Sequence, residues 1–317
     1  MINVFTSPLA NDIRAFIEFK HATGVAFTDG EHIMRKFDHY AASTGSTSLT
    51  RNTVEGFISV FESGKPHPNR HYLSYLRGFA VFCQACGHQD AHVVSPVFTS
   101  HQPRPATYLL DQTQIDAFFE TAAMFKAADP WGWQATAFFG LMLTCGLRTC
   151  EAYKLNRSEV HLNEGVIDVL WSKGPRSRRL PISNEVAAML AACDHQNTVF
   201  APGRTRFFIS TRGGPVNSST PSRVFHRIWQ TTQLPVPASK PKPVPYAFRH
   251  HFAYANIERW AANGIDPLTK LPYLARYMGH ADVASTYYYL ALSPDYAATY
   301  ANTAHTSQML IPEIEDA

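Results

Sequence analysis

The sequence has no long hydrophobic run, and this absence excludes a membrane-spanning protein. No apolar stretch of the 317 residues approaches the roughly 18 residues that cross a bilayer as a helix. A secretory signal needs a continuous apolar segment near the N-terminus, and Asp12, Arg14, Glu18 and Lys20 interrupt that region. We therefore expect a soluble protein of the cytoplasm, with no membrane partner.

Cysteine is also scarce. The five cysteines are an odd number without a regular spacing, so a disulfide framework is excluded. Cys83 and Cys86 have the spacing of half a zinc site, but we interpret them as two buried thiols on a helix. Reduced thiols agree with a cytoplasmic protein.

Two motifs that bind reactive cofactors are missing. The sequence contains neither the glycine-rich loop of nucleotide-binding enzymes nor an acidic cluster suited to a two-metal nuclease. We therefore expect chemistry that uses no cofactor and no metal.

Charge is low overall but unevenly distributed. The net charge is only +3, yet residues 171–249 contain twelve Lys and Arg against two acidic residues, a net of +10. The other regions are neutral or acidic. A basic segment of this kind predicts a surface for a polyanion such as nucleic acid.

Hydrophobic periodicity predicts a mainly α protein with a small β-sheet, in two domains. Residues 1–95 contain four amphipathic helices and form an all-helical domain, and the prolines of residues 96–106 mark a linker. Residues 107–317 form the second domain, with a buried central helix at residues 131–144 and a basic hairpin with strands at residues 166–171 and 179–182. The four N-terminal helices are expected at residues 7–24, 28–45, 50–64 and 69–87.

Four ordered motifs in the second domain carry the chemistry. Gly146-Leu-Arg-Thr-Cys-Glu151 is followed by Lys173 in the hairpin, then by Tyr246-x-x-Arg249-His250, and then by Gly279-His280 with Tyr289 nine residues after the histidine. This order resembles the tyrosine recombinase (phage integrase) family, and the resemblance covers residues 107–292.

The resemblance implies a catalytic role for each matched residue. Tyr289 would attack a DNA phosphodiester, and Arg148 and Arg249 would hold the phosphate, because a guanidinium can direct two donors at its oxygens. Lys173 would protonate the leaving 5′ oxygen, and His280 would hold the phosphate or the tyrosine in line. Tyr288 is the alternative nucleophile, although a slip of one residue would turn the helix by about 100°.

Tyr246 is the remaining catalytic residue of the motifs, and three neighbours have supporting roles. The family commonly has histidine where this chain has Tyr246, which can still donate a hydrogen bond to phosphate. Glu151 would neutralise Arg148, His250 would brace the site, and Tyr287 would pack against the domain. Further DNA contacts are expected from Arg176, Arg178, Arg179, Lys240 and Lys242.

The implied function is site-specific DNA cleavage and rejoining through a 3′-phosphotyrosyl intermediate, as in the integrase or transposase of a mobile element. The first domain would be a DNA-binding, core-binding domain. The partners would be double-stranded DNA, three further copies of the chain in a tetramer on two sites, and accessory proteins of the element. A C-terminal segment with Tyr296 and Tyr300 would dock on the neighbouring copy. The alternatives are DNA relaxation like that of a type IB topoisomerase, or an inactive DNA-binding regulator.

Overall fold

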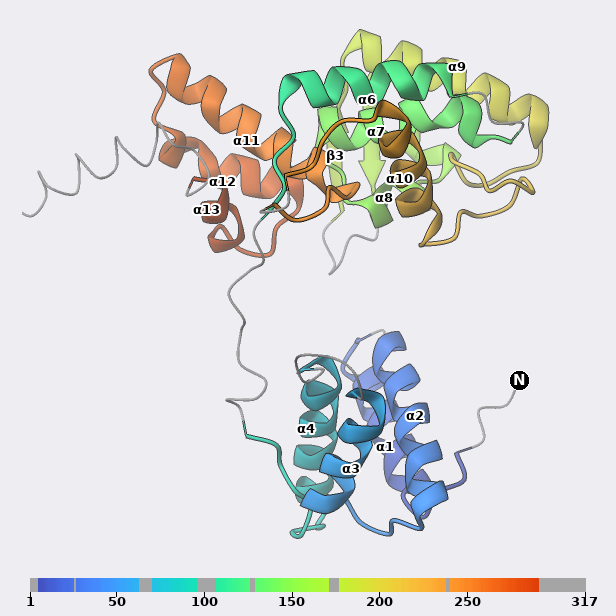
Figure 1. Ribbon diagram of the computed structural model, residues 1–317, viewed down its shortest axis with the longest axis vertical. Helices are drawn as coiled ribbons and strands as arrows, with labels where there is room; N and C mark the ends of the chain where they lie inside the picture. The colour runs from blue at the N-terminus through green and yellow to red at the C-terminus, as the bar shows by residue number, and fades with distance from the viewer. Residues whose placement is uncertain are drawn as a thin grey trace, which may run out of the picture. The chain divides into compact units, whose positions relative to one another are not determined.

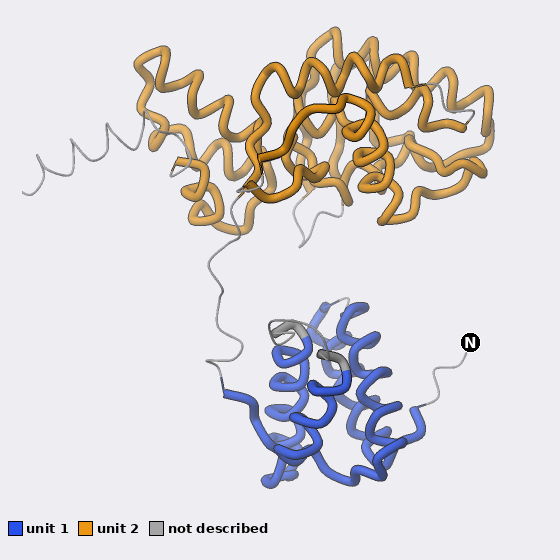
Figure 2. The backbone as a smooth tube through the Cα atoms, viewed as in Figure 1, with its two compact units in different colours: residues 1–104 blue, residues 105–317 orange. Residues whose placement is uncertain are grey.

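The chain divides into two compact units, residues 1–104 and residues 105–317 (Figure 2). A computed structural model describes residues 5–25, 27–62, 70–95, 107–125, 129–170, 177–237 and 240–290. The predicted linker, residues 96–106, lies outside these ranges. So do Lys173 and Arg176 of the predicted hairpin and the segment with Tyr296 and Tyr300.

The first unit is a four-helix module built around one phenylalanine from each helix. Phe16, Phe37, Phe57 and Phe79 are all at most 1% exposed. Their rings touch across the module, with centroids 5.4 Å apart for Phe16 and Phe79 and 5.3 Å apart for Phe37 and Phe57. Such aromatic pairs add about 0.5–1.5 kcal/mol each beyond the burial of area. The helices are α1 (Ala10–Ala22), α2 (Thr28–Thr44), α3 (Arg51–Glu62) and α4 (Arg70–Ala85).

The second unit is organised around α7 (Trp131–Cys145), as the apolar segment predicts. Ten of its residues are buried, because the helix is apolar on all sides and packs against α6, α9 and α11. Helices α11, α12 and α13 gather at one end of this unit (Figure 1). Its helices are α6 (Gln112–Met124), α7, α8 (Thr149–Lys154), the 3-10 turn η1 (Arg157–Glu159), α9 (Asn184–Phe200), α10 (Thr220–Thr232), α11 (Tyr246–Ala262), α12 (Pro267–Met278) and α13 (Ala284–Leu290).

A small antiparallel sheet, in the order β1-β2-β3, adjoins these helices. The predicted hairpin corresponds to β2 (Val166–Val169) and β3 (Arg178–Pro181), and the short β1 (Val160–His161) was not predicted. The fold class, mainly α with a small sheet, is confirmed. Among the helices of the described ranges, none is long and apolar enough to span a membrane.

Candidate active site

Two glycine turns bring the two arginines of the motifs, Arg148 and Arg249, to one place. Helix α7 ends at Gly146 and α12 ends at Gly279, with φ of 59° and 68°, in the left-handed region that favours glycine. A Cβ on Gly146 would lie 2.5 Å from the Phe252 ring, and one on Gly279 would lie 2.7 Å from Nη1 of Arg178. The conformation of both turns therefore favours glycine, and at Gly146 a side chain would also displace the Phe252 ring.

The guanidinium groups of Arg148 and Arg249 donate to consecutive carbonyls at the end of α12. Nη2 of Arg148 lies 2.7 Å from the Gly279 carbonyl oxygen, and Nη2 of Arg249 lies 2.9 Å from that of Met278. These carbonyls belong to the last turn of the helix, which has no further intrahelical donors and carries partial negative charge. Arg148 and Arg249, which are 101 positions apart in the sequence, thus bind neighbouring carbonyls at the end of the same helix.

Glu151 lies between two arginines, and Arg148, Glu151 and Arg178 form what we call the Glu151 triad. Nη1 of Arg148 donates to one carboxylate oxygen at 2.7 Å, and Nη2 of Arg178 donates to the other at 2.7 Å. The Glu151 side chain is 1% exposed. Arg148 is the N-cap residue that precedes α8, and its backbone N–H also donates to Glu151, as expected for an acid in the first helical turn.

The electrostatics of the triad favour the charged carboxylate. Burial raises the pKa of Glu151, but the hydrogen bonds and positive charges of Arg178 and Arg148 outweigh it and lower that pKa to about 2. With one anion for two cations, the triad retains a net positive charge next to His280.

Arg249 is fully buried and incompletely satisfied. Its Nη1 donates to the Gly146 carbonyl and its Nη2 to Met278, while its Nε–H has no hydrogen-bond partner among the described residues. Burial lowers the pKa of Arg249, although a guanidinium stays charged in proteins. A buried charged donor without a partner is costly, so an anion that accepts from this Nε–H would be stabilised.

Helix α13 places Tyr289 between two histidines. Asp282 caps the helix by accepting a hydrogen bond from the Ser285 N–H. The Tyr289 hydroxyl lies 3.1 Å from Nδ1 of His250, and its ring stacks on that of His280, with centroids 6.4 Å apart and planes 9° apart. Nδ1 of His280 is in turn 2.7 Å from the Thr286 hydroxyl.

The three consecutive tyrosines have different environments. Tyr289 is 3% exposed and belongs to the small core of α11, α12 and α13, whereas Tyr287 is 51% exposed. The prediction that Tyr287 packs against the domain is therefore wrong, because its position on α13 faces solvent. The Tyr288 hydroxyl lies 2.5 Å from that of Thr107, at the start of the second domain.

Both histidines next to Tyr289 are held neutral at physiological pH. Burial and the charge of Arg249 lower the pKa of His250 to about 4. Burial and the charges of Arg249 and Arg148 lower the pKa of His280 to about 4 as well. Each ring therefore has one nitrogen with a lone pair that can accept a proton and one N–H that can donate a hydrogen bond.

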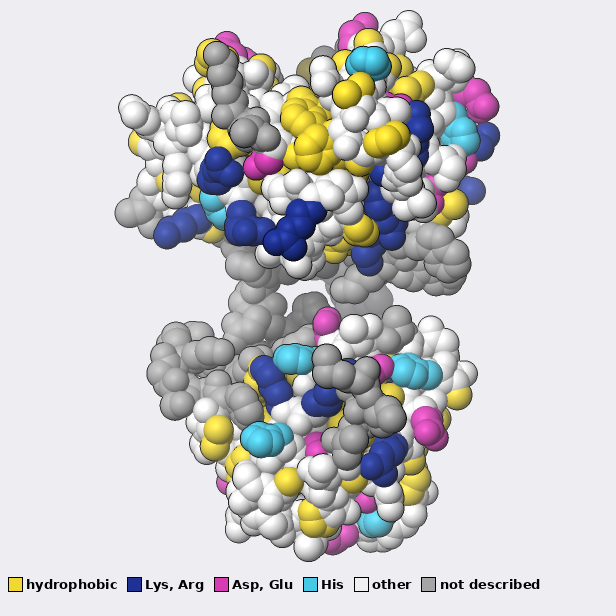
Figure 3. Space-filling model, turned by 90° about the vertical axis from the view of Figure 1, so that its right-hand side faces the viewer, with side chains coloured by type: hydrophobic (Ala, Val, Ile, Leu, Met, Phe, Trp, Pro, Cys, Tyr) yellow, Lys and Arg dark blue, Asp and Glu magenta, His cyan; other side chains and the backbone are white. Residues whose placement is uncertain are grey.

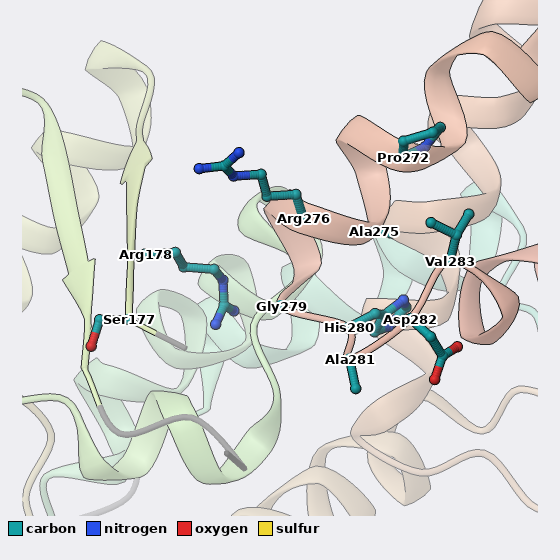
Figure 4. A pocket seen from close by; sticks show the side chains of 10 residues that line it. All are labelled: Ser177, Arg178, Pro272, Ala275, Arg276, Gly279, His280, Ala281, Asp282 and Val283. Carbon is teal, nitrogen blue, oxygen red and sulfur yellow. The ribbon is translucent and has the colours of Figure 1, made fainter. Parts of the chain in front are cut away.

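A cavity of about 490 Å³ adjoins His280. Arg178 on β3 and Arg276 on α12 reach into the space between these two elements, and His280, Ala281 and Asp282 line its other side (Figure 4). Sequence reasoning missed Arg276, which lies in the last turn of α12 and lines the same cavity as His280 in the turn that follows.

The remaining predicted residues of the described ranges have different surroundings. Tyr246 begins α11, and its ring contacts that of His250, with centroids 4.7 Å apart. Arg179 pairs with Asp168 across β2 and β3, and Lys240 lies over the Tyr108 ring. Lys242 is exposed. On the upper body in Figure 3, which is the second unit, Lys and Arg side chains form a band with few acidic neighbours.

The cysteine pair requires a correction. Cys83 is buried, with a pKa raised to about 12 by burial, but Cys86 is exposed just beyond the end of α4. Sequence reasoning also overlooked His88 and His92, which follow at a spacing typical of metal ligands. The described residues contain no group of three or more His, Cys, Asp or Glu that could hold a metal ion, so the structure does not bring this set together.

Comparison with known proteins agrees with the motif order. Residues 109–295, more than half of the chain, match the description "Phage integrase family". The chain belongs to the phage integrase family. It is a tyrosine recombinase-family enzyme, which confirms the resemblance stated from the motifs.

Relatives of the family match from about three quarters to nearly all of the chain. The protein y4rE of Sinorhizobium fredii, provisionally named an integrase/recombinase, is 25% identical over 309 residues, covering 96% of this chain and 98% of its own. Tyrosine recombinase XerC of Nitrobacter winogradskyi is 29% identical over 243 residues, covering 74% of this chain and 70% of its own.

Solved structures share the fold. The Tn1549 transposon integrase in complex with transposon right end DNA has a TM-score of 0.63 at 18% identity, covering 92% of this chain and 98% of its own. The XerH site-specific recombinase bound to its difH substrate has a TM-score of 0.63 at 15% identity, covering 86% of this chain and 78% of its own.

Proposed function

We propose that Tyr289 cleaves and rejoins DNA strands at specific sites. The observation that carries this proposal is the convergence of Arg148 and Arg249 on the carbonyls of Met278 and Gly279, immediately before His280 and within reach of the buried Tyr289. The Tyr289 oxygen would bond to phosphorus as the bond to the 5′ oxygen breaks, and the product would be a 3′-phosphotyrosyl ester. Because that ester retains the energy of the broken bond, a 5′ hydroxyl can reseal it without ATP.

The arginines would stabilise the charge that builds on the phosphoryl oxygens. The Nε–H of Arg249 supports this role, since it is buried, charged and without a hydrogen-bond partner among the described residues. Arg148, which follows the turn at Gly146, would donate to the same phosphate together with Arg249. Such preorganised donors stabilise a transition state because they need no reorientation when charge develops.

Other residues would complete the reaction. Lys173 would donate the proton that the leaving 5′ oxygen takes up, Tyr246 would donate a hydrogen bond to the phosphate, and His280 would hold the phosphate or Tyr289 in line. Arg178 and Arg276, which line the cavity beside His280, would contact a neighbouring phosphate.

Recombination requires more than one copy of the enzyme. We propose that two DNA sites are held by four copies of the chain, with the helical residues 1–95 as the core-binding domain and with Arg176, Arg179, Lys240 and Lys242 on the DNA backbone. Crystals of homologous folds include a lambda integrase dimer bound to a core site, which supports assembly on DNA. The reaction on DNA would take place in the cytoplasm, at the nucleoid.

A nicked suicide substrate tests the proposal. Cleavage next to a nick releases a short fragment, so the covalent adduct cannot reseal and denaturing electrophoresis detects it. We expect the adduct with the native protein and with Tyr288→Phe, and none with Tyr289→Phe. An adduct with Tyr289→Phe would assign the nucleophile elsewhere. DNA binding without any adduct would favour the inactive regulator, and relaxation of any supercoiled plasmid by a monomer would favour the topoisomerase.

A further inference from the structure

The contact between Tyr289 and His250 has a chemical consequence that the family motifs do not assign. A phenol is a poor nucleophile at neutral pH, because its pKa is near 10, unless a neighbouring group takes its proton. The acceptor must lie within hydrogen-bond reach of the hydroxyl. Nδ1 of His250, at 3.1 Å, meets this requirement.

The neighbouring histidines have other partners. The ring of His280 is nearly parallel to the Tyr289 ring, with centroids 6.4 Å apart, and its Nδ1 is hydrogen-bonded to the Thr286 hydroxyl. His251 follows His250 on α11 but points elsewhere, because successive helical residues are about 100° apart. Its Nδ1 lies 3.0 Å from the Leu110 carbonyl oxygen.

Rigid packing fixes the His250 ring against Tyr289. Tyr246 lies one turn before His250 on α11, and its ring meets the imidazole edge to face at 4.7 Å. On the other side, the rings of Tyr288 and Tyr289 on α13 lie 6.4 and 5.5 Å from the imidazole. The residue that fills the usual histidine position of the motif therefore supports a histidine one turn further along the same helix.

We propose that His250 is the general base of strand cleavage, an inference that rests on the nucleophilic role of Tyr289. As the Tyr289 oxygen bonds to phosphorus, its O–H bond breaks and the proton moves to Nδ1 of His250, giving an imidazolium. The bond from phosphorus to the 5′ oxygen breaks, and that oxygen takes its proton from Lys173. In resealing, the 5′ hydroxyl attacks phosphorus and returns its proton to Lys173, the bond from phosphorus to the Tyr289 oxygen breaks, and the imidazolium returns its proton to that oxygen.

The charges around His250 agree with this role. The groups that face it are Tyr246 and Arg249 of α11 and Tyr288 and Tyr289 of α13, with His280 beyond the Tyr289 ring. Arg249 and burial keep the imidazole neutral, so that it has a lone pair to accept the proton. The negative charge of a bound phosphodiester opposes that of Arg249, which raises the basicity of His250 when DNA is present.

A pH profile of adduct formation distinguishes a base from a structural brace. Single-turnover rates are measured from pH 5 to 10 with saturating suicide substrate. At pH 7 we expect His250→Gln to be about 10²–10⁴-fold slower than the native protein, the usual contribution of a general base. The deficit should shrink steadily as the pH approaches the pKa of the phenol, because ionised tyrosine needs no base. His251→Gln is the matched control and should stay within about twofold of the native rate.

The results that would contradict the role of His250 differ from those that would contradict the proposed function. A deficit of His250→Gln that is the same at every pH, or no deficit at all, would overturn the role of His250 while Tyr289 remains the nucleophile. The absence of an adduct from the native protein at every pH would overturn both. Should His250→Gln unfold, imidazole added to His250→Ala provides a second test, and failure to restore cleavage in a folded, DNA-binding variant would also overturn the proposal.

Discussion

Replacing Glu151 with glutamine tests whether the Glu151 triad organises the active site. The fall of the pKa of Glu151 from its ordinary 4.5 to about 2 corresponds to roughly 3 kcal/mol, at about 1.4 kcal/mol per pH unit. Because the folded-state pKa is depressed, this stabilisation is complete above pH 4.5 and is lost as the pH falls toward 2. Glutamine mimics the protonated carboxyl and leaves Arg148 and Arg178 without an anion.

We therefore expect Glu151→Gln to lower the free energy of unfolding of the second unit by about 3 kcal/mol at pH 7, or the Tm by roughly 6–12 °C. Tryptophan fluorescence reports this unit alone, since all five tryptophans lie within residues 105–317. Denaturant titrations at pH 7 and at pH 3 give the comparison, and the deficit should roughly halve at pH 3, because the carboxyl of the unfolded chain is then protonated while that of the folded protein is still mostly ionised.

Glu159→Gln is the matched control for this experiment. Glu159 is also buried, but it accepts from Asn156, and no described arginine donates to it. We expect its substitution to cost about 1 kcal/mol. The reasoning is refuted if both variants lose the same stability at pH 7, or if the deficit of Glu151→Gln is unchanged at pH 3.

Three further predictions concern cleavage and DNA binding. Arg148→Ala or Arg249→Ala should slow adduct formation by about 10²–10³-fold or more while the protein still binds DNA. Near-native rates would show that these arginines do not stabilise the phosphoryl oxygens during cleavage. Tyr246→Phe should slow cleavage by about 10–100-fold, since it deletes one hydrogen bond to a charged group, and an unchanged rate would make Tyr246 a packing residue. Arg276→Ala should weaken DNA binding and reduce the slope of log K against log salt concentration by about 1. Arg259→Ala, which removes a cation elsewhere on the second unit, should do neither. Equal slopes for the two variants would exclude a phosphate contact at Arg276.

The sequence predicts most of the secondary structure because hydrophobic periodicity and helix-ending glycines are local signals. Gly45 ends α2 and Gly146 ends α7 as expected, and the apolar run at residues 131–144 is the central helix. The two-residue β1 gives no such signal, because a strand this short has no measurable alternation.

Side-chain partners were harder to predict, because they depend on tertiary packing. Arg178 and Arg179 look alike in a basic hairpin, yet Arg178 turns inward to Glu151 and Arg179 pairs with Asp168 on the exposed side. Alternation along β3 separates the two, but only the packing of the sheet decides which one is buried. The contact between His250 and Tyr289 likewise depends on the crossing of α11 and α13, and no spacing in the sequence encodes it.

Peptide mapping of the trapped adduct tests the assignment of the nucleophile most directly. Trypsin should release residues 277–317 as one peptide, because no Lys or Arg follows Arg276. Fragmentation between consecutive tyrosines then locates the nucleotide that remains attached. We predict that it is on Tyr289, the buried tyrosine next to His250 and His280; a nucleotide on Tyr288 or Tyr287 would contradict this account.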